Sequence, residues 1–213
     1  MAECSALRAG CLVMAAGNAS RFGENKLAAR FDGQSLFSLA LAAIPAEHVC
    51  PRHGVVSQYP ALLEEASLAG FDTILNDRPE DGISRTIRLG TQAMADCAGI
   101  LYMVADQPLL RAGTVRRVVD AWWANPDCIA AAAHNGKRGN PCLFPARFFP
   151  ELCALEADRG GSSVIRRHED ALLLVEAGAR AVRLRHKAGA GDPEGKRIAP
   201  LIPGAAGGAW RDR

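Results

Sequence analysis

The sequence lacks the features that mark several classes of protein. No stretch approaches the roughly 18 consecutive apolar residues of a membrane-spanning helix. The N-terminus has no basic start followed by a long apolar segment, so it predicts no secretory signal. The seven cysteines form no Cys-x-x-Cys pair, and several lie inside apolar runs. We interpret them as reduced core residues, not as disulfides or zinc ligands, and expect a cytoplasmic protein.

Two well-known phosphate-binding motifs are also missing. The Walker motif ends in Gly-Lys-Ser or Gly-Lys-Thr, and neither tripeptide occurs in the chain. The dinucleotide-binding motif needs the spacing Gly-x-Gly-x-x-Gly, which Gly17 and Gly23 do not fit. A nucleotide site in this chain must therefore use another kind of loop.

The charge is nearly balanced over the whole chain but not along it. The 213 residues are 49% hydrophobic and 23% charged, as in an ordinary globular protein with one large domain. The net charge of +2 argues neither for nor against a polyanionic partner. From Arg180 onward, eight basic residues stand against three acidic ones. We predict one domain over residues 1–178 and a basic, Ala/Gly-rich tail over residues 179–213 that is weakly ordered or divergent.

Apolar runs and amphipathic segments alternate along the chain. Runs of strand length occur at residues 11–16, 49–57, 71–75, 99–105, 129–133 and 171–176. Helical patterns occur at residues 35–45, 61–69, 83–94, 115–122, 145–155 and 162–168. Between the strand at 129–133 and the helix at 145–155 we expect a basic turn over 136–139 and a short extended segment over 141–144. This alternation predicts an α/β, Rossmann-like fold with a mainly parallel sheet and helices on both faces.

The loop after the first strand is rich in small residues and carries two cations. Its candidate nucleotide-binding residues are Ala15, Ala16, Gly17, Asn18, Arg21 and Lys26. Small residues let backbone N–H groups approach an anion, and fixed cations neutralise it. One interpretation is a cradle for a triphosphate; the other is a surface loop with solvated cations.

A carboxylate follows the clearest strand of the chain. Asp106 comes directly after residues 99–105, and the carboxyl ends of parallel strands are where an open α/β sheet binds ligands. A carboxylate beside a triphosphate is expected to hold Mg²⁺. The alternative is that Asp106 caps the helix after Pro108 or holds a turn. With Arg21 and Lys26 as further catalytic residues, the arrangement suits attack on an α-phosphorus with pyrophosphate as the leaving group.

Other polar residues are open to two interpretations each. Ser84 is placed to contact a base or ribose, or it is the N-cap of its helix. The polar turn that contains Asn140 and Pro141 is suited to gripping an acceptor or to turning the chain. Asp158 precedes the helix at 162–168. It either helps to bind the acceptor or only belongs to the turn from which that helix starts. We expect Trp122 in the core of its helix and Trp123 at the rim.

Several motifs, taken together, resemble those of a known family. The segments are Ala15-Ala16-Gly17, Arg21-Phe22-Gly23, Lys26-Leu27, Asp81-Gly82-Ile83-Ser84, Ala105-Asp106-Gln107-Pro108, Arg138-Gly139-Asn140-Pro141-Cys142-Leu143-Phe144 and Asp158-Arg159-Gly160-Gly161. Their order resembles the MobA-like nucleotidyltransferases over roughly residues 11–168. The Ala-Ala-Gly turn is similar to that of the molybdenum cofactor cytidylyltransferases, the MocA-like branch.

The resemblance implies a fold of the nucleotide-diphospho-sugar transferase type and a specific activity. That activity is transfer of CMP from CTP to molybdenum-bearing molybdopterin, with Mg²⁺ and release of pyrophosphate. It also implies a transient molybdoenzyme partner, and neither nucleic acid nor a membrane. Alternatives are guanylyl or other nucleotidyl transfer to a different phosphorylated acceptor, or a catalytically weak binding protein that serves a molybdoenzyme.

The chain departs from the family pattern at three places. Ala19 stands where Ser is frequent, and Ser162-Ser163 replace an Ala-Arg pair. The family's closing Asp-Ile-Asp-Thr-Pro-Glu-Asp segment, whose aspartate is expected to help hold the metal, has only a displaced counterpart around Asp192. This last departure is what favours the binding-protein alternative.

Overall fold

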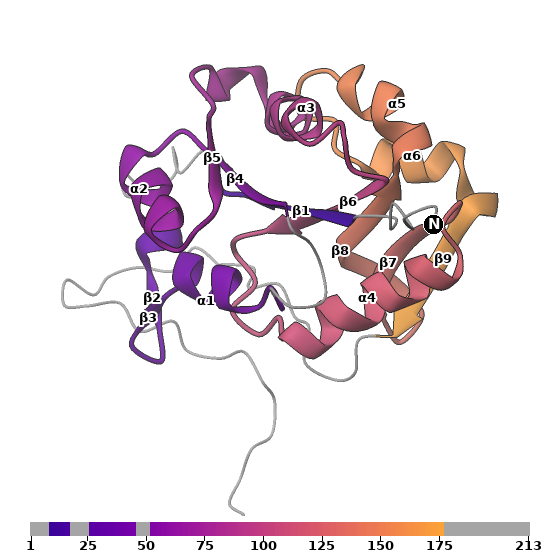
Figure 1. Ribbon diagram of the computed structural model, residues 1–213, viewed down its shortest axis with the longest axis horizontal. Coiled ribbons are helices and arrows are strands. Elements are labelled where there is room, and N and C mark those ends of the chain that lie inside the picture. The colour runs from indigo at the N-terminus through magenta and orange to yellow at the C-terminus, as the bar shows by residue number, and fades with distance from the viewer. Residues whose placement is uncertain (1–8, 18–25, 46–51, 177–213) are drawn as a thin grey trace, which may run out of the picture.

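The computed structural model describes residues 9–17, 26–45 and 52–176, which form one central sheet with helices packed against it (Figure 1). Across the sheet, the order of strands is β5 (Asp72–Leu75), β4 (His53–Ser57), β1 (Ala9–Met14), β6 (Gly99–Val104), β8 (Lys137–Pro145), β7 (Ile129–His134) and β9 (Leu172–Glu176). Only β8 is antiparallel to its neighbours among these strands. The predicted mainly parallel, Rossmann-like α/β sheet is confirmed.

Helices cover both faces of the sheet. They are α1 (Leu36–Ala42), α2 (Pro60–Leu68), α3 (Ile83–Ala93), α4 (Ala112–Ala124), α5 (Phe149–Cys153) and α6 (Ser162–Arg167). Short 3-10 turns span Lys26–Ala28, Pro79–Asp81, Ala146–Phe148 and Glu169–Ala171, and β2 (Arg30–Phe31) and β3 (Gln34–Ser35) form a small hairpin. One core lies between the sheet and α1, α2 and α4, and the other between the sheet and α3, α5 and α6.

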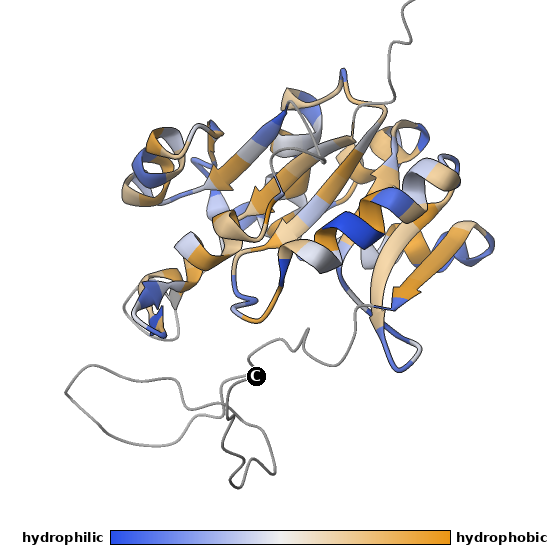
Figure 2. Ribbon diagram, turned by 60° about the horizontal axis from the view of Figure 1, so that its bottom comes forward, coloured by the Kyte–Doolittle hydropathy of each residue, from blue (hydrophilic) through white to orange (hydrophobic). Residues whose placement is uncertain are grey.

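The two cores explain why the central strands are apolar almost throughout. Successive side chains of a strand point to opposite faces, so Cys11 and Val13 enter one core while Leu12 enters the other. A strand covered on both faces cannot alternate apolar with polar residues. Figure 2 shows the result: hydrophobic residues along the strands, and hydrophilic ones at loop tips and on the outer sides of helices.

The packing of α3 depends on a glycine. A Cβ atom at Gly90 would lie 2.1 Å from Cδ2 of Leu12, so the helix approaches β1 as closely as it does only without a side chain there. Ile87, Gly90 and Met94 share the buried face, as expected. Ile83, which we expected on the same face, is the first residue of α3 and is 36% exposed.

The region before α5 differs from the sequence prediction. The expected turn over 136–139 and the expected polar turn at Asn140 and Pro141 are both wrong, because residues 137–145 form the single strand β8. The turn is at Asn135 and Gly136, whose φ values of 51° and 70° suit a two-residue hairpin, so pairing with β7 resumes at Lys137. The register shifts opposite residues 131–133, and this irregularity accommodates Pro141 within a strand.

Other expectations concern the core and the chain ends. Trp122 is fully buried and Trp123 is 43% exposed, which confirms the expected core and rim positions. Cys11, Cys128, Cys142 and Cys153 are free thiols, and burial raises the pKa of the Cys11 thiol to about 12. In the described ranges, no helix is both long and apolar enough to cross a bilayer. The predicted tail over 179–213 lies outside the described residues.

Candidate functional site

The candidate site lies where β1 and β6 end. The two strands are parallel neighbours, with Met14 opposite Val104, so the segments that follow them emerge side by side at the carboxyl edge of the sheet. The N–H of Ala105 donates to the carbonyl oxygen of Met14 at 3.3 Å, which holds the two exits together. Asp106 follows at once and is partly exposed. The structure thus brings Ala15–Gly17, the start of the first loop, and Asp106 to the same edge of the sheet.

Only the beginning of the candidate nucleotide loop is described. Ala15 and Ala16 are buried, whereas Gly17 is exposed. Asn18, Arg21 and the side chain of Lys26 lie outside the described residues, so the predicted triphosphate cradle remains a prediction.

The last residue of β4 and the two residues after it contact the start of this loop, a contact that the sequence analysis did not predict. Ser57 Oγ donates to the carbonyl oxygen of Ala15 at 3.1 Å, and Gln58 Nε2 donates to that of Ala16 at 3.1 Å. Tyr59 donates its hydroxyl hydrogen to the carbonyl oxygen of Gly17 at 3.4 Å. The only sequence signal was a run of three polar residues directly after an apolar strand. We call these three side chains the carbonyl clamp.

Ser84 is not the N-cap that one interpretation expected. Gly82 holds that position, and Ser84 is 1% exposed within the first turn of α3. Its hydroxyl donates to the carbonyl oxygen of Asp81 at 3.3 Å, and its N–H donates to that of Ala157 at 3.2 Å. Ser84 therefore lies at the start of α3, at the carboxyl edge of the sheet, with its hydroxyl held by the preceding turn.

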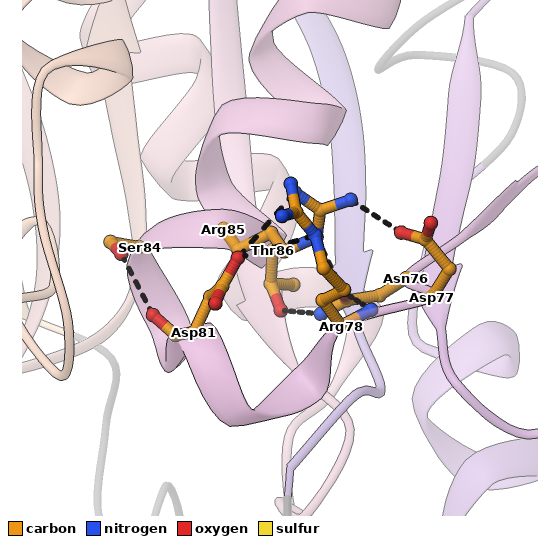
Figure 3. Close-up of polar contacts among 7 residues, drawn as sticks. All are labelled: Asn76, Asp77, Arg78, Asp81, Ser84, Arg85 and Thr86. Carbon is orange, nitrogen blue, oxygen red and sulfur yellow. Dashed lines mark hydrogen bonds and ion pairs between the residues drawn. The ribbon is translucent and has the colours of Figure 1, made fainter.

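Arg85 organises the loop between β5 and α3 (Figure 3). Its side chain is only 13% exposed, and its Nε donates to Asn76 Oδ1 at 3.1 Å. It also pairs with Asp77 and, at 3.6 Å, with Asp81. The hydrogen bond from Arg85 is the main reason that the pKa of Asp77 is lowered. Arg85 thus offsets two carboxylates that would otherwise repel an anion at this edge.

Sequence reasoning overlooked Arg85 and its partner Asn76. Asn76 is 1% exposed, and its Nδ2 donates to Thr86 Oγ1 at 3.2 Å (Figure 3). A buried asparagine is rare without such partners. The available signal was the position of Asn76, as the first polar residue after the apolar strand at 71–75.

The candidate acceptor residues come from two segments. Because β8 is antiparallel, its first residues lie at the same edge as the carboxyl end of β6, and this places partly exposed Asn140 and buried Pro141 there. Asp158 is exposed in the loop between α5 and α6. A Cβ atom at Gly82 would lie 2.8 Å from Asp158 Oδ1, so this loop rests against the start of α3. Asp158 is therefore close to the first turn of α3, which contains Ser84 and which we call the Ser84 turn.

Asp106 fits one kind of metal site and not another. Among the described residues, no group of three or more His, Cys, Asp or Glu side chains comes together. A cage built from protein ligands alone is thus not present in that part of the chain. Mg²⁺, however, commonly takes one or two carboxylates and completes its shell with phosphate oxygens and water. A single carboxylate beside a loop that is predicted to bind phosphate fits that second arrangement.

Solved structures with the same fold include nucleotidyltransferases. Rv0371c of Mycobacterium tuberculosis superposes with a TM-score of 0.68 at 20% identity, covering 83% of this chain and 92% of that one. A complex of Rv0371c with manganese gives a TM-score of 0.64 at 20% identity, with 79% and 89% covered. The nucleotidyl transferase Mth528 from Methanothermobacter gives 0.68 at 20% identity, with 82% and 89% covered.

A more distant likeness extends to an enzyme solved with a nucleotide. CMP:2-keto-3-deoxy-manno-octonic acid synthetase complexed with CTP gives a TM-score of 0.66 at 9% identity, covering 83% of this chain and 92% of that one. At such identities, these likenesses establish the fold alone.

Sequence comparison identifies the family. No curated protein matches the sequence. A family model described as the MobA-like NTP transferase domain matches residues 11–172, which include most of β1, all of β6, Asp106 and most of the described residues. On that match, the chain belongs to the MobA-like NTP transferase family and is a nucleotidyltransferase by membership.

Proposed function

We propose that this protein is a molybdenum cofactor cytidylyltransferase, which moves CMP from CTP to molybdenum-bearing molybdopterin and releases pyrophosphate. The observation that carries the proposal is the exit of the first loop and of Asp106 from neighbouring parallel strands at one sheet edge. Small residues suited to phosphate and a carboxylate suited to a cation are thereby side by side. Family membership supports nucleotidyl transfer, and a structural relative complexed with CTP supports the choice of nucleotide.

The proposed reaction needs no nucleophilic side chain. An oxygen of the acceptor phosphate attacks the α-phosphorus of CTP, and a new P–O bond forms. The bond from the α-phosphorus to the bridging oxygen of the β-phosphate breaks, and pyrophosphate leaves with that electron pair. The protein's part is to position both substrates and to offset charge on the leaving group.

On the nucleotide side, we assign phosphate binding to backbone N–H groups of Ala16, Gly17 and Asn18. Ala15 precedes them, and its own N–H donates to the carbonyl oxygen of Val56 at 2.9 Å. Arg21 and Lys26 then offset charge on the β- and γ-phosphates as they depart. The buried Ser84 turn forms the wall beside the ribose and base.

Asp106 is the proposed ligand of Mg²⁺. When bound, the ion supplies positive charge to the phosphate oxygens. The manganese complex of Rv0371c supports the use of a divalent cation in this fold. Asp106 itself contributes a fixed anionic oxygen at the edge of the sheet, adjacent to the phosphate loop.

On the acceptor side, we assign Asn140, Pro141 and Asp158. Arg138, at the start of β8, donates from Nη1 to Ser162 Oγ at 3.4 Å, which brings a cation to this side of the site. An acceptor that ends in a phosphate suits such a cation. We further propose that the product is handed to a molybdoenzyme in the cytoplasm, and free thiols fit a reducing compartment of that kind.

The test is transfer of label from α-labelled CTP, GTP and ATP to molybdenum-loaded molybdopterin in the presence of Mg²⁺. Transfer from CTP alone is the expected result. Transfer from GTP would support nucleotidyl transfer but show that the substrate carries guanine and not cytosine. Transfer only to other phosphorylated acceptors would show that molybdopterin is not the acceptor. Binding of CTP without transfer would favour a catalytically weak maturation protein, the alternative suggested by the missing family aspartate near the C-terminus.

A further inference from the structure

The carbonyl clamp joins three consecutive side chains to three consecutive carbonyls across two strands. We propose that its members are positioning residues, which turn the backbone N–H groups of Ala16 and Gly17 toward the triphosphate. This inference rests on the proposed function, because it assigns those N–H groups to phosphate. The paired register is unusual for chance contacts: Ser57, Gln58 and Tyr59 meet residues 15, 16 and 17 in the same order.

Peptide geometry gives the clamp its direction. In a planar trans peptide, the carbonyl of one residue and the N–H of the next point in opposite directions. The clamp holds the carbonyl oxygens of Ala15 and Ala16 on the side of β1 that faces β4. The N–H groups of Ala16 and Gly17 are therefore directed to the other side of β1. That side faces β6, which ends at Val104, two residues before Asp106.

The clamp is built on a rigid base. Ser57 is fully buried, and its Oγ also accepts the N–H of Tyr59 at 3.1 Å. The carbonyl oxygen of Ser57 accepts the N–H of Asn76 at 2.9 Å, and the N–H of Ala15 donates to Val56 O at 2.9 Å. The Ser57 donor and the backbone that carries the other two donors are thus held by neighbouring strands before any ligand binds. Preorganised donors of this kind raise affinity because less ordering is needed on binding.

The outer two contacts are better suited to orienting the loop than to stabilising the fold. Gln58 and Tyr59 are partly exposed, and Gly17 is exposed. Water can replace a hydrogen bond to an exposed carbonyl, so its net contribution to folding is small. The peptide planes, by contrast, lose their fixed orientation when the donors are removed. A positioning role and a structural role therefore predict different measurements.

The test uses a double variant, Gln58→Met with Tyr59→Phe, which removes both donors and keeps side-chain size. Gln92→Met is the control, because Gln92 is exposed on α3, away from the clamp. Binding of Mg–CTP, Mg–GTP, Mg–ATP and tripolyphosphate is measured by calorimetry, and stability by urea unfolding. We expect the double variant to lose about tenfold in affinity for every triphosphate that the wild type binds, since two hydrogen bonds are involved. Unfolding midpoints and the control's affinities should stay unchanged.

The outcomes separate the inference from the function on which it rests. If the wild type binds triphosphates and the double variant binds them equally well, the positioning role of the carbonyl clamp is refuted. The proposed function is not affected by that result. A loss of affinity matched by a fall in the unfolding midpoint would overturn it in favour of a structural role. A wild-type protein that binds neither a nucleoside triphosphate nor tripolyphosphate would overturn both.

Discussion

Replacing Gly82 by alanine tests the contact between the Ser84 turn and the loop that carries Asp158. Gly82 has a φ of 83° and a ψ of −173°, a backbone conformation nearly restricted to glycine. A Cβ atom there would lie 2.5 Å from the carbonyl carbon and oxygen of Ala157. Backbone atoms cannot move aside as a flexible side chain can, so the loop must shift.

The expected cost has two parts that a second glycine separates. Conformational strain at such a position costs about 1–3 kcal/mol, and overpacking against backbone adds about 1–3 kcal/mol. Gly70 has a φ of 84°, and nothing lies within 4 Å of its Cβ position. Gly70→Ala therefore carries strain without the clash. We expect Gly82→Ala to reduce the free energy of unfolding by about 2 kcal/mol more than Gly70→Ala does.

Urea unfolding followed by circular dichroism measures both variants. Because Asp158 is proposed to contact the acceptor, Gly82→Ala should also raise KM for the acceptor, whereas Gly70→Ala should not. Equal destabilisation by the two substitutions would refute the close approach of residues 157–158 to the start of α3. An unchanged acceptor KM, with the larger destabilisation present, would remove Asp158 from the acceptor site.

Three further predictions concern single side chains. Asp106→Asn should lower kcat by about 10²–10³-fold with unchanged unfolding, measured by pyrophosphate release at saturating Mg²⁺; wild-type turnover would exclude Asp106 from the mechanism. Lys26→Ala should weaken CTP binding by at least about tenfold in calorimetry, and unchanged affinity would contradict the prediction that the first loop binds the triphosphate. Glu151 accepts hydrogen bonds from Arg167 at 2.7 Å and from His168, and its pKa is lowered chiefly by Arg167. Its ionised form therefore stabilises the fold fully above the ordinary pKa of 4.5, and that contribution disappears as the pH falls through the lowered folded-state pKa. Glu151→Gln should be less stable than wild type at pH 7 and equally stable at strongly acidic pH; a gap that stays constant with pH would contradict the ion pair.

The fold was predictable because its signals are local. The segment that forms β6 is apolar over its whole length, and the segments that form α3 and α4 have a clear helical periodicity. These patterns were enough to predict an α/β fold from the sequence. The start of β8 was not predicted, because a proline and a glycine inside a strand look like a turn. Only the pairing with β7, across an Asn-Gly hairpin and a register shift, shows that residues 137–141 belong to the sheet.

The candidate site was predictable only where it follows directly from a strand. Asp106 and Ala15–Gly17 come immediately after apolar runs, so the fold class places them at the carboxyl edge. The carbonyl clamp joins residues 42 positions apart, and no local pattern reports such a contact. Arg85 was overlooked for the same reason, since its partner Asn76 lies nine positions away in a preceding strand exit.

The parallel arrangement of β9 also bears on how the protein is handled. The described chain enters the sheet at Ala9, at the amino end of β1, and leaves it at Glu176, opposite Ala133 at the carboxyl end of β7. Glu176 Oε1 accepts the N–H of Gly136, which ties this exit to the tip of the β7–β8 hairpin. A fusion partner joined directly after residue 176 would therefore leave β9 at the edge of the sheet on which the candidate active site lies, three strands away from β6. One joined directly before residue 9 would enter β1 at the opposite edge, so for the assays above that position is the better of the two.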